Sequence, residues 1–184
     1  MVDRKNSPFF TWVGLKKAKW RLTKNELLAL VSVLALFLLA VSITSYLLGN
    51  INESLPEGVS MKTPIFSDLG VQAIPGILVY ALFNTSLLEE IFFRGFLLKR
   101  FSKDVDFEVR NTIQALLFGF MHSIALFSIG QLVLAALVTI STGLIAFLFG
   151  YITEKKFDGS ILPSWGIHGL ANIIASLGVA FSLF

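Results

Sequence analysis

The sequence predicts an all-α protein, a multispanning transmembrane helical bundle of about five spans preceded by a basic N-terminal interfacial segment. The chain has 184 residues, 55% of them apolar and 15% charged, and its mean hydropathy is +0.77. The apolar residues fall into long blocks, which is typical of membrane proteins. A helix of about 20 apolar residues spans roughly 30 Å of hydrocarbon, so this length has room for about five crossings. The absence of cysteine excludes disulfides, thiolate nucleophiles and Cys-ligated metals.

Residues 1–26 are expected to form a basic cytoplasmic or interfacial segment that precedes the bundle of residues 27–184. Its last basic residues lead into 23 uncharged residues, without the short apolar core and cleavage site of a signal peptide. The first apolar stretch is therefore expected to stay in the membrane. Apolar residues among the lysines favour contact with the membrane surface, and a solvated basic tail is the alternative. These residues are Phe9, Phe10, Trp12, Leu15 and Trp20.

Five apolar stretches are the expected spans. The block 111–152 is too long for one helix, because its 42 residues would extend roughly 63 Å, about twice the hydrocarbon core. We therefore expect a turn at residues 127–131. Pro163 suits the first turn of the last helix. The expected spans are 27–49, 71–98, 111–126, 131–152 and 162–184.

The distribution of basic residues predicts the orientation, since cytoplasmic loops near span ends collect Lys and Arg. If the N-terminus is inside, seven basic residues precede the first span, four lie in 99–110 and two in 153–161. The opposite side then holds only Lys62, and Arg94 lies within a span. This bias of thirteen to one predicts a cytoplasmic N-terminus in a plasma-membrane protein.

Five ionisable residues lie inside the expected spans. A charge at the centre of a membrane helix costs about 2.5 kcal/mol or more, so each is a functional hypothesis. Residues four apart share a helix face, and Glu90 is therefore expected to pair with Arg94. Glu89 lies about 100° around the helix and can face the interior of the bundle. The remaining two ionisable residues are His122 and His168.

Helical rise places four polar residues at one depth. Glu89 lies about ten residues, or roughly 15 Å, from the cytoplasmic end of its span. His122 lies roughly 16 Å into its span, and His168 and Asn172 lie about 9 and 15 Å into the last one. We expect these side chains to meet in one layer that is reached from the cytoplasm. Phe118, four residues before the first histidine, is expected to shield or position it.

Two hydroxyl groups, those of Thr85 and Ser86, lie one turn before the glutamates and are expected to orient them. A carboxylate and an imidazole at one depth can hold and deprotonate a water molecule, while a second imidazole and an amide donate to an oxyanion. Such a site fits peptide hydrolysis. We favour no metal, because no HExxH helix is present. If zinc binds, the expected ligands are Glu89, His122 and His168, with one position open for water.

Three motifs occur in order, each within an expected span. Glu89–Arg94 has the pattern EExxxR, Phe118–His122 has FxxxH and His168–Asn172 has HxxxN. Together they resemble the CPBP family of intramembrane proteases, which includes the type II CaaX prenyl endopeptidases and the bacterial Abi proteins. The resemblance covers about residues 71–180.

The resemblance implies an all-helical bundle with a conical cavity open to the cytoplasm. It implies that Glu89 works with His122 to activate water. It also implies that His168 and Asn172 form the oxyanion hole, and that Glu90 and its arginine partner are supporting residues. The family is described both as metalloproteases and as glutamic proteases. We favour the glutamic mechanism, because a histidine and an asparagine suit an oxyanion better than a metal.

The resemblance also bears on partners. The chain is shorter than the eukaryotic prenyl proteases, and short bacterial members are linked to bacteriocin maturation or self-immunity. The expected partners are membrane lipids and a peptide or protein substrate, either lipidated or a bacteriocin precursor, and no nucleic acid.

Two other functional classes stay open on the sequence. A non-catalytic bacteriocin-immunity or partner-binding protein would use the same fold, because polar membrane residues also link helices. A proton-coupled transporter would use intramembrane carboxylates and histidines as a relay, but the chain shows no internal repeat.

Overall fold

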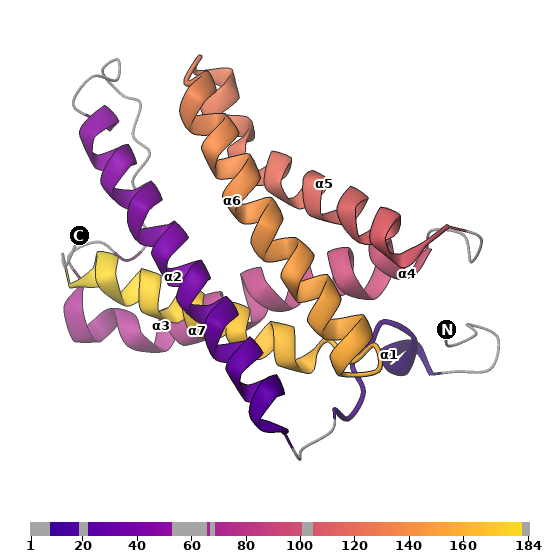
Figure 1. Ribbon diagram of the computed structural model, residues 1–184. Helices are drawn as coiled ribbons and strands as arrows, with labels where there is room; N and C mark the ends of the chain where they lie inside the picture. Colours follow the sequence, from indigo (N-terminus) through magenta and orange to yellow (C-terminus); the bar gives the residue numbers. More distant parts are fainter. Residues whose placement is uncertain (1–7, 19–21, 53–65, 67–68, 101–104, 182–184) are drawn as a thin grey trace.

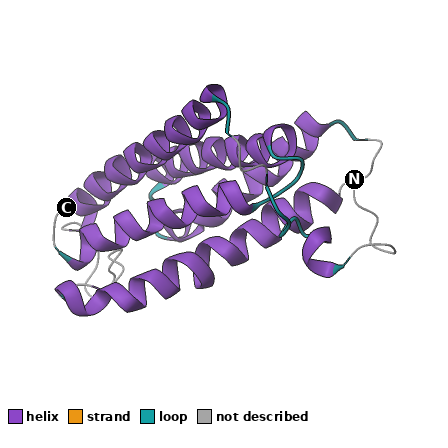
Figure 2. Cartoon of the chain, turned by 90° about the horizontal axis from the view of Figure 1, so that it is seen from below, coloured by secondary structure: helices purple, strands orange, loops and turns teal. Residues whose placement is uncertain are grey.

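The computed structural model describes residues 8–18, 22–52, 66, 69–100 and 105–181, and these form helices joined by loops, with no strand among them (Figure 1, Figure 2). The predicted all-α bundle is confirmed. The α-helices are α1 (Phe9–Trp12), α2 (Lys24–Asn52), α3 (Ile74–Val79), α4 (Leu98–Arg100), α5 (Phe107–Ser128), α6 (Leu132–Tyr151) and α7 (Leu162–Ala180). The 3₁₀ segment η3 (Gly70–Ala73) and the π-helical segments η4 (Tyr80–Leu87), η5 (Glu90–Leu97) and η6 (Ile152–Lys156) continue them.

Residues 70–100 form one helical rod that contains two π-helical stretches, η4 and η5. A π turn widens the helix and is found most often at functional sites. Side chains bond to carbonyls of the widened turns: Ser86 Oγ donates to Ala81 O, and Trp165 Nε1 donates to Leu82 O at 2.7 Å. In a lipid environment such internal partners replace the water that would otherwise solvate the backbone.

Helices α5 and α6 form a hairpin with the most extensive helix–helix contact of the bundle (Figure 1). The predicted turn at residues 127–131 is confirmed, since the helices are separated by residues 129–131. Gly130 has φ 75° there, a conformation that glycine adopts without a steric penalty. Helix α5, which carries His122, also packs on η5 and α4.

Helix α7 packs along η4, and α2 packs on α6 and α7. One side of α2 faces the bundle: Val33 is buried, Leu34 and Phe37 pack on the same apolar cluster as Phe149, and Leu47 packs on the cluster of Leu126. The opposite side is exposed, for example at Leu39. Helix α2 therefore forms an outer wall beside the α6 and α7 pair.

The surface is apolar, whereas the interior contains charged groups. Large apolar side chains are exposed on the long helices, among them Leu39, Met121 and Val133. The side chains of Glu90 and Arg94 are 0% exposed. This is the reverse of the pattern in soluble proteins, and it is expected of a chain whose solvent is lipid. The protein is therefore an integral membrane protein.

Three described helices are long and apolar enough to cross a membrane, namely Lys24–Leu47, Gly70–Arg100 and Leu132–Lys156. Helices α5 and α7 are not among them, because polar residues such as His122, His168 and Asn172 interrupt their apolar sequence. Five long helices thus correspond to the five expected spans. For α5 and α7 a membrane crossing stays a prediction.

Part of the N-terminal segment is packed against the bundle. Trp12 and Val13 are 8% and 1% exposed, whereas Phe9 and Phe10 are exposed. The Ile161 N–H donates to the Gly14 carbonyl at 2.9 Å. Trp12, Val13 and Gly14 therefore pack against the bundle and are not part of a solvated tail. Trp20, also expected at the interface, lies outside the described residues.

Candidate active site

A cavity of about 420 Å³ lies between α2, η4, α5, α6 and α7. Its lining includes all four residues that the sequence places in one polar layer, together with the supporting aromatic residue. These residues are Glu89, His122, His168, Asn172 and Phe118. The structure thus brings these side chains from three separate helices around one cavity, while their common depth in the membrane stays a prediction.

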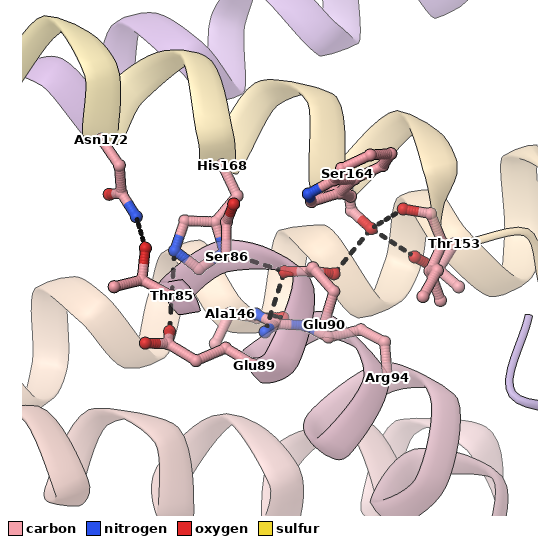
Figure 3. A network of polar contacts seen from close by, with 12 residues as sticks. Thr85, Ser86, Glu89, Glu90, Arg94, Ala146, Thr153, Ser164, His168 and Asn172 are labelled. Carbon is pink, nitrogen blue, oxygen red and sulfur yellow. Dashed lines mark hydrogen bonds and ion pairs between the residues drawn. The ribbon is translucent and has the colours of Figure 1, made fainter. Parts of the chain in front are cut away.

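Glu89 lies between the two π-helical stretches and points into the cavity, with 30% of its side chain exposed. Its Oε2 atom is 3.6 Å from Nε2 of His168 and 3.9 Å from Nε2 of His122. Figure 3 shows the contact with His168. Both distances exceed an ordinary hydrogen bond, and the Oε2 atom is buried without a hydrogen-bond partner. One carboxylate oxygen thus faces two imidazole nitrogens across a gap.

The second ring nitrogen of each histidine has a partner that orients the ring. Nδ1 of His122 lies 2.8 Å from the Phe118 carbonyl, and Nδ1 of His168 lies 3.1 Å from Oε1 of Glu90. A carbonyl and a carboxylate accept hydrogen bonds, so Nδ1 carries the proton in both rings. The Nε2 atoms are therefore the ones left for chemistry at Glu89.

Aromatic rings surround the two histidines. Phe118 stacks on His122 with ring centroids 4.3 Å apart and planes inclined by 26°. His168 has Phe37 and Phe149 at centroid distances of 5.6 Å each. The predicted positioning of His122 by Phe118 thus corresponds to a direct ring stack and a backbone hydrogen bond.

Asn172 is oriented by Thr85. Its Nδ2 donates to Thr85 Oγ1 at 3.1 Å (Figure 3). The threonine hydroxyl in turn donates to the carbonyls of Tyr80 and Ala81. The expectation that Thr85 and Ser86 orient the glutamates is wrong. Both hydroxyls are instead engaged by carbonyls of the π-helical turn, whose altered geometry the sequence pattern did not reveal.

Glu90 is held by two hydrogen bonds and one ion pair (Figure 3). Its Oε1 lies 3.1 Å from Nη1 of Arg94 and 3.1 Å from Nδ1 of His168. Ser164 Oγ donates to its Oε2 at 2.7 Å, and Thr153 Oγ1 lies 3.1 Å from that serine hydroxyl. The predicted pair of Glu90 and Arg94 is confirmed as an ion pair.

Arg94 joins this carboxylate to the α5–α6 hairpin. Its Nη2 donates to the Ala146 carbonyl at 3.4 Å, and Gln114 Nε2 donates to the same carbonyl at 3.0 Å. The guanidinium carbon lies 4.6 Å from the Phe118 ring centroid and 5.2 Å from that of Phe149. Arg94 thus connects Glu90, which bonds to His168, with the aromatic ring that stacks on His122.

The donor chemistry of the cavity can be compared with that of zinc sites. One carboxylate and two imidazoles are common ligands, and each imidazole is held through Nδ1, as zinc-bound histidines are. In the described part of the chain, however, no three His, Asp or Glu side chains are grouped closely enough to hold one ion. The donor types fit zinc and the spacing does not form a complete site, so the expected absence of a metal stays a prediction.

Sequence reasoning missed several residues that build this site. Ser164 precedes His168 by four residues and Asn172 by eight, so helical spacing could have found it. Thr153 and Phe37 lie on other helices than the three motifs, and no helical spacing connects them to the motif residues. They reach the site only through the packing of η6 and α2.

The chain was compared with known proteins. The sequence model of the family described as type II CAAX prenyl endopeptidase Rce1-like matches residues 71–174, more than half of the chain. The matched region contains all three motifs and every charged or amide side chain of the cavity. No curated protein and no solved structure matches the chain.

Proposed function

The chain belongs to the Rce1-like family of type II CAAX prenyl endopeptidases, and we propose that its cavity hydrolyses a peptide bond of a membrane-associated peptide or protein. One observation carries the proposal: a single oxygen of Glu89 faces Nε2 of both His122 and His168, at 3.9 and 3.6 Å. A general base needs to reach its proton directly or through one water. This arrangement offers Glu89 and His122 to a water molecule and places His168 beside them, where the carbonyl oxygen of the substrate would lie.

In the proposed reaction, water attacks the carbonyl carbon of the scissile bond. Glu89 accepts a proton from that water, and His122 holds the water through Nε2. The tetrahedral intermediate then collapses, and the proton held by Glu89 passes to the departing amine. The C–N bond breaks, one C–O bond forms, and no protein nucleophile is needed.

The carbonyl oxygen becomes an oxyanion during this step. We assign its stabilisation to His168 Nε2 and to the second N–H of the Asn172 amide, whose first N–H is used by Thr85. For Nε2 to donate, His168 must be protonated on both nitrogens, because Nδ1 already donates to Glu90. The charges of both glutamates, Arg94 and this imidazolium then sum to zero, the least costly state for a buried cluster.

Two residues are assigned supporting roles. Glu90 holds the ring plane of His168, and Arg94 provides the counter-charge of Glu90. Neither residue lines the cavity at Glu89. They act through the histidine and count as positioning residues.

A zinc-dependent mechanism is the alternative for the same residues. Zinc would be held by Glu89, His122 and His168 and would activate a bound water as a Lewis acid. The metal-free mechanism is favoured, because Asn172 and a doubly protonated His168 suit an oxyanion. Metal analysis of the purified protein decides between the two, since zinc lost together with the histidines would overturn the metal-free mechanism.

The wall that α2 contributes to the cavity bears on the choice of substrate. Part of the lining comes from α2, at Phe37, Val41 and Thr44, which lies outside the family-matched region. This wall carries no charge and is mostly apolar, so an extended apolar peptide segment suits it. We propose a substrate of the bacteriocin-maturation or self-immunity type, approached from the cytoplasmic side of the plasma membrane. A lipidated protein is the competing substrate.

The test uses the full-length protein in detergent micelles with three peptide probes. They are an apolar leader-type peptide, a farnesylated peptide ending in a CAAX sequence and the same peptide without the farnesyl group. Glu89→Gln and, separately, His122→Ala are expected to lower cleavage by about 10²- to 10⁴-fold, the usual contribution of acid–base catalysis. The exposed Glu108→Gln serves as the matched control and should cleave at the wild-type rate.

Cleavage by both site variants at the wild-type rate would refute the catalytic assignment. A non-catalytic immunity protein would instead protect cells from a bacteriocin equally well with Glu89→Gln. Cleavage of the farnesylated peptide alone would replace the bacteriocin-type substrate with a lipidated one.

A further inference from the structure

A second cavity, of about 250 Å³, lies at the end of the bundle where α4 ends, α5 begins and η6 meets α7. The N-terminal segment forms its remaining wall through Trp12 and Lys16. It shares no lining residue with the cavity at Glu89. The charged lining consists of Lys16, Lys99, Arg100, Arg110, Glu154 and Asp158.

Positive charge dominates this lining, with four cations against two carboxylates. Lys99 donates to the Gly159 carbonyl at 2.6 Å and lies 3.9 Å from Glu154, so these groups hold one another. Arg110 uses Nη1 on the Leu98 carbonyl at 3.3 Å, whereas its Nε is buried without a hydrogen-bond partner. A buried donor of this kind costs free energy unless a ligand accepts from it. The cavity is therefore suited to an anion.

The backbone around the cavity is held in place. The Gly14 carbonyl accepts from the Ile161 N–H at 2.9 Å, and the Lys16 carbonyl accepts from Ser160 Oγ at 2.7 Å. Gly14 has φ 89°, and a Cβ there would lie 2.6 Å from Lys99 Nζ. Only glycine allows this close approach. Hydrogen bonds and close packing thus fix the N-terminal segment as one wall of the cavity.

Neighbouring side chains indicate the level of the cavity in the membrane. Phe9 and Phe10, one turn before Trp12, are 61% and 65% exposed. Exposed aromatic residues beside basic ones are typical of the interface between lipid tails and headgroups. The guanidinium of Arg100 stacks on the Trp12 ring at 3.3 Å, which ties this aromatic segment to the cavity. Phosphate groups of lipids lie at this level.

We propose that this cavity binds the phosphate headgroup of an anionic phospholipid. Basic pockets between membrane helices recognise lipid phosphates through charge-assisted hydrogen bonds. Arg110 donates from Nε, and Lys16 closes the site from the N-terminal segment. The bound lipid joins this segment to α4 and α5 and stabilises the folded bundle. The proposal does not depend on the proteolytic function.

The test measures the thermal unfolding temperature of the full-length protein in a neutral detergent during titration with phosphatidylglycerol. Phosphatidylcholine and inorganic phosphate are titrated in parallel. Arg110→Gln is compared with Lys155→Gln, which removes the same charge from an exposed side chain outside the cavity. Phosphatidylglycerol should stabilise the wild type and Lys155→Gln, with an affinity about tenfold weaker in Arg110→Gln, the equivalent of one charge-assisted hydrogen bond.

Equal stabilisation of Arg110→Gln and wild type by phosphatidylglycerol would overturn the proposal. Equal stabilisation by phosphatidylcholine would show that the effect is not one of anionic headgroups, and protection by inorganic phosphate alone would make this a site for soluble anions. Should Arg110→Gln fail to fold, Lys16→Gln takes its place, because the Lys16 side chain lies at the half-buried rim. The affinity of Lys16→Gln for phosphatidylglycerol must then fall for the proposal to stand.

Discussion

Glu89 and Glu90 are neighbours in the sequence, yet their surroundings are opposite. The Glu90 side chain is 0% exposed and is bonded by Arg94, His168 and Ser164. The Glu89 side chain is 30% exposed, and its Oε2 is buried without a hydrogen-bond partner. A saturated carboxylate can hold other groups in place but has no capacity left for chemistry. The comparison therefore assigns positioning to Glu90 and reactivity to Glu89.

The same division extends beyond the two glutamates. Glu90 and three neighbours form a buried layer, which we call the brace. Arg94 and Ser164 contact Glu90 directly, and Thr153 contacts Ser164. Residues around Glu89 line an open cavity. Removing a residue of the brace should therefore cost stability, whereas removing a residue of the cavity should cost activity. His168 belongs to both layers, because its two ring nitrogens face different glutamates.

The largest expected effect is that of Arg94→Met, which removes the counter-charge of Glu90. An isolated buried charge left after removal of its partner destabilises a protein by about 3–5 kcal/mol. The free energy of unfolding, measured by SDS titration of the protein in mixed micelles, should fall by this amount. Lys155→Met, at an exposed cation, should stay within about 0.5 kcal/mol of wild type.

A double variant sharpens this result. Glu90→Gln combined with Arg94→Met removes both charges, so it should recover part of the stability lost in Arg94→Met alone. If the double variant is as unstable as the sum of both single variants, the ion pair is not the reason for the loss.

A smaller effect is expected for Ser164→Ala. The substitution removes the hydrogen bond to Glu90 Oε2 and leaves that oxygen buried, which costs about 1–3 kcal/mol. Unfolding free energy measured in the same way should show this loss. Ser128→Ala, whose exposed hydroxyl donates only to the Ala125 carbonyl at 2.7 Å, is the matched control. An equal loss in both variants would contradict a special role for Ser164.

The smallest effect is expected for Thr85→Val in the cavity layer. Asn172 loses its acceptor, and the oxyanion donor becomes less well oriented by roughly one hydrogen bond. The value of kcat/KM should fall about tenfold, with little change in unfolding temperature. Thr112→Val removes a helical hydroxyl outside the cavity and should leave both quantities unchanged. A loss of stability without loss of kcat/KM would move Thr85 from the cavity layer to the brace.

Much of this site follows from spacing in the sequence. The four-residue interval predicted the pair of Glu90 and Arg94 and the contact of Phe118 with His122, because helical geometry fixes such neighbours. Depth along the spans predicted that Glu89, both histidines and Asn172 meet. The roles of Thr85 and Ser86 were misjudged, since the expectation assumed regular α-helix where the chain has π-helical turns.

By itself, the sequence determined the all-helical membrane class, the turn of the α5–α6 hairpin and the identity of the polar layer. These properties depend on composition, charge and periodicity, which are local. Helical spacing to Arg94 and the family resemblance also predicted that Glu90 is the supporting glutamate and Glu89 the free one. Only the tertiary structure decided how completely Glu90 is enclosed and which distant residues enclose it. The enclosure of Glu90 is completed by Ser164 and His168 on α7, a helix far from Glu90 in the sequence. No local pattern encodes the packing of those helices against one another, and this packing separates two adjacent carboxylates into a brace and a reactive group.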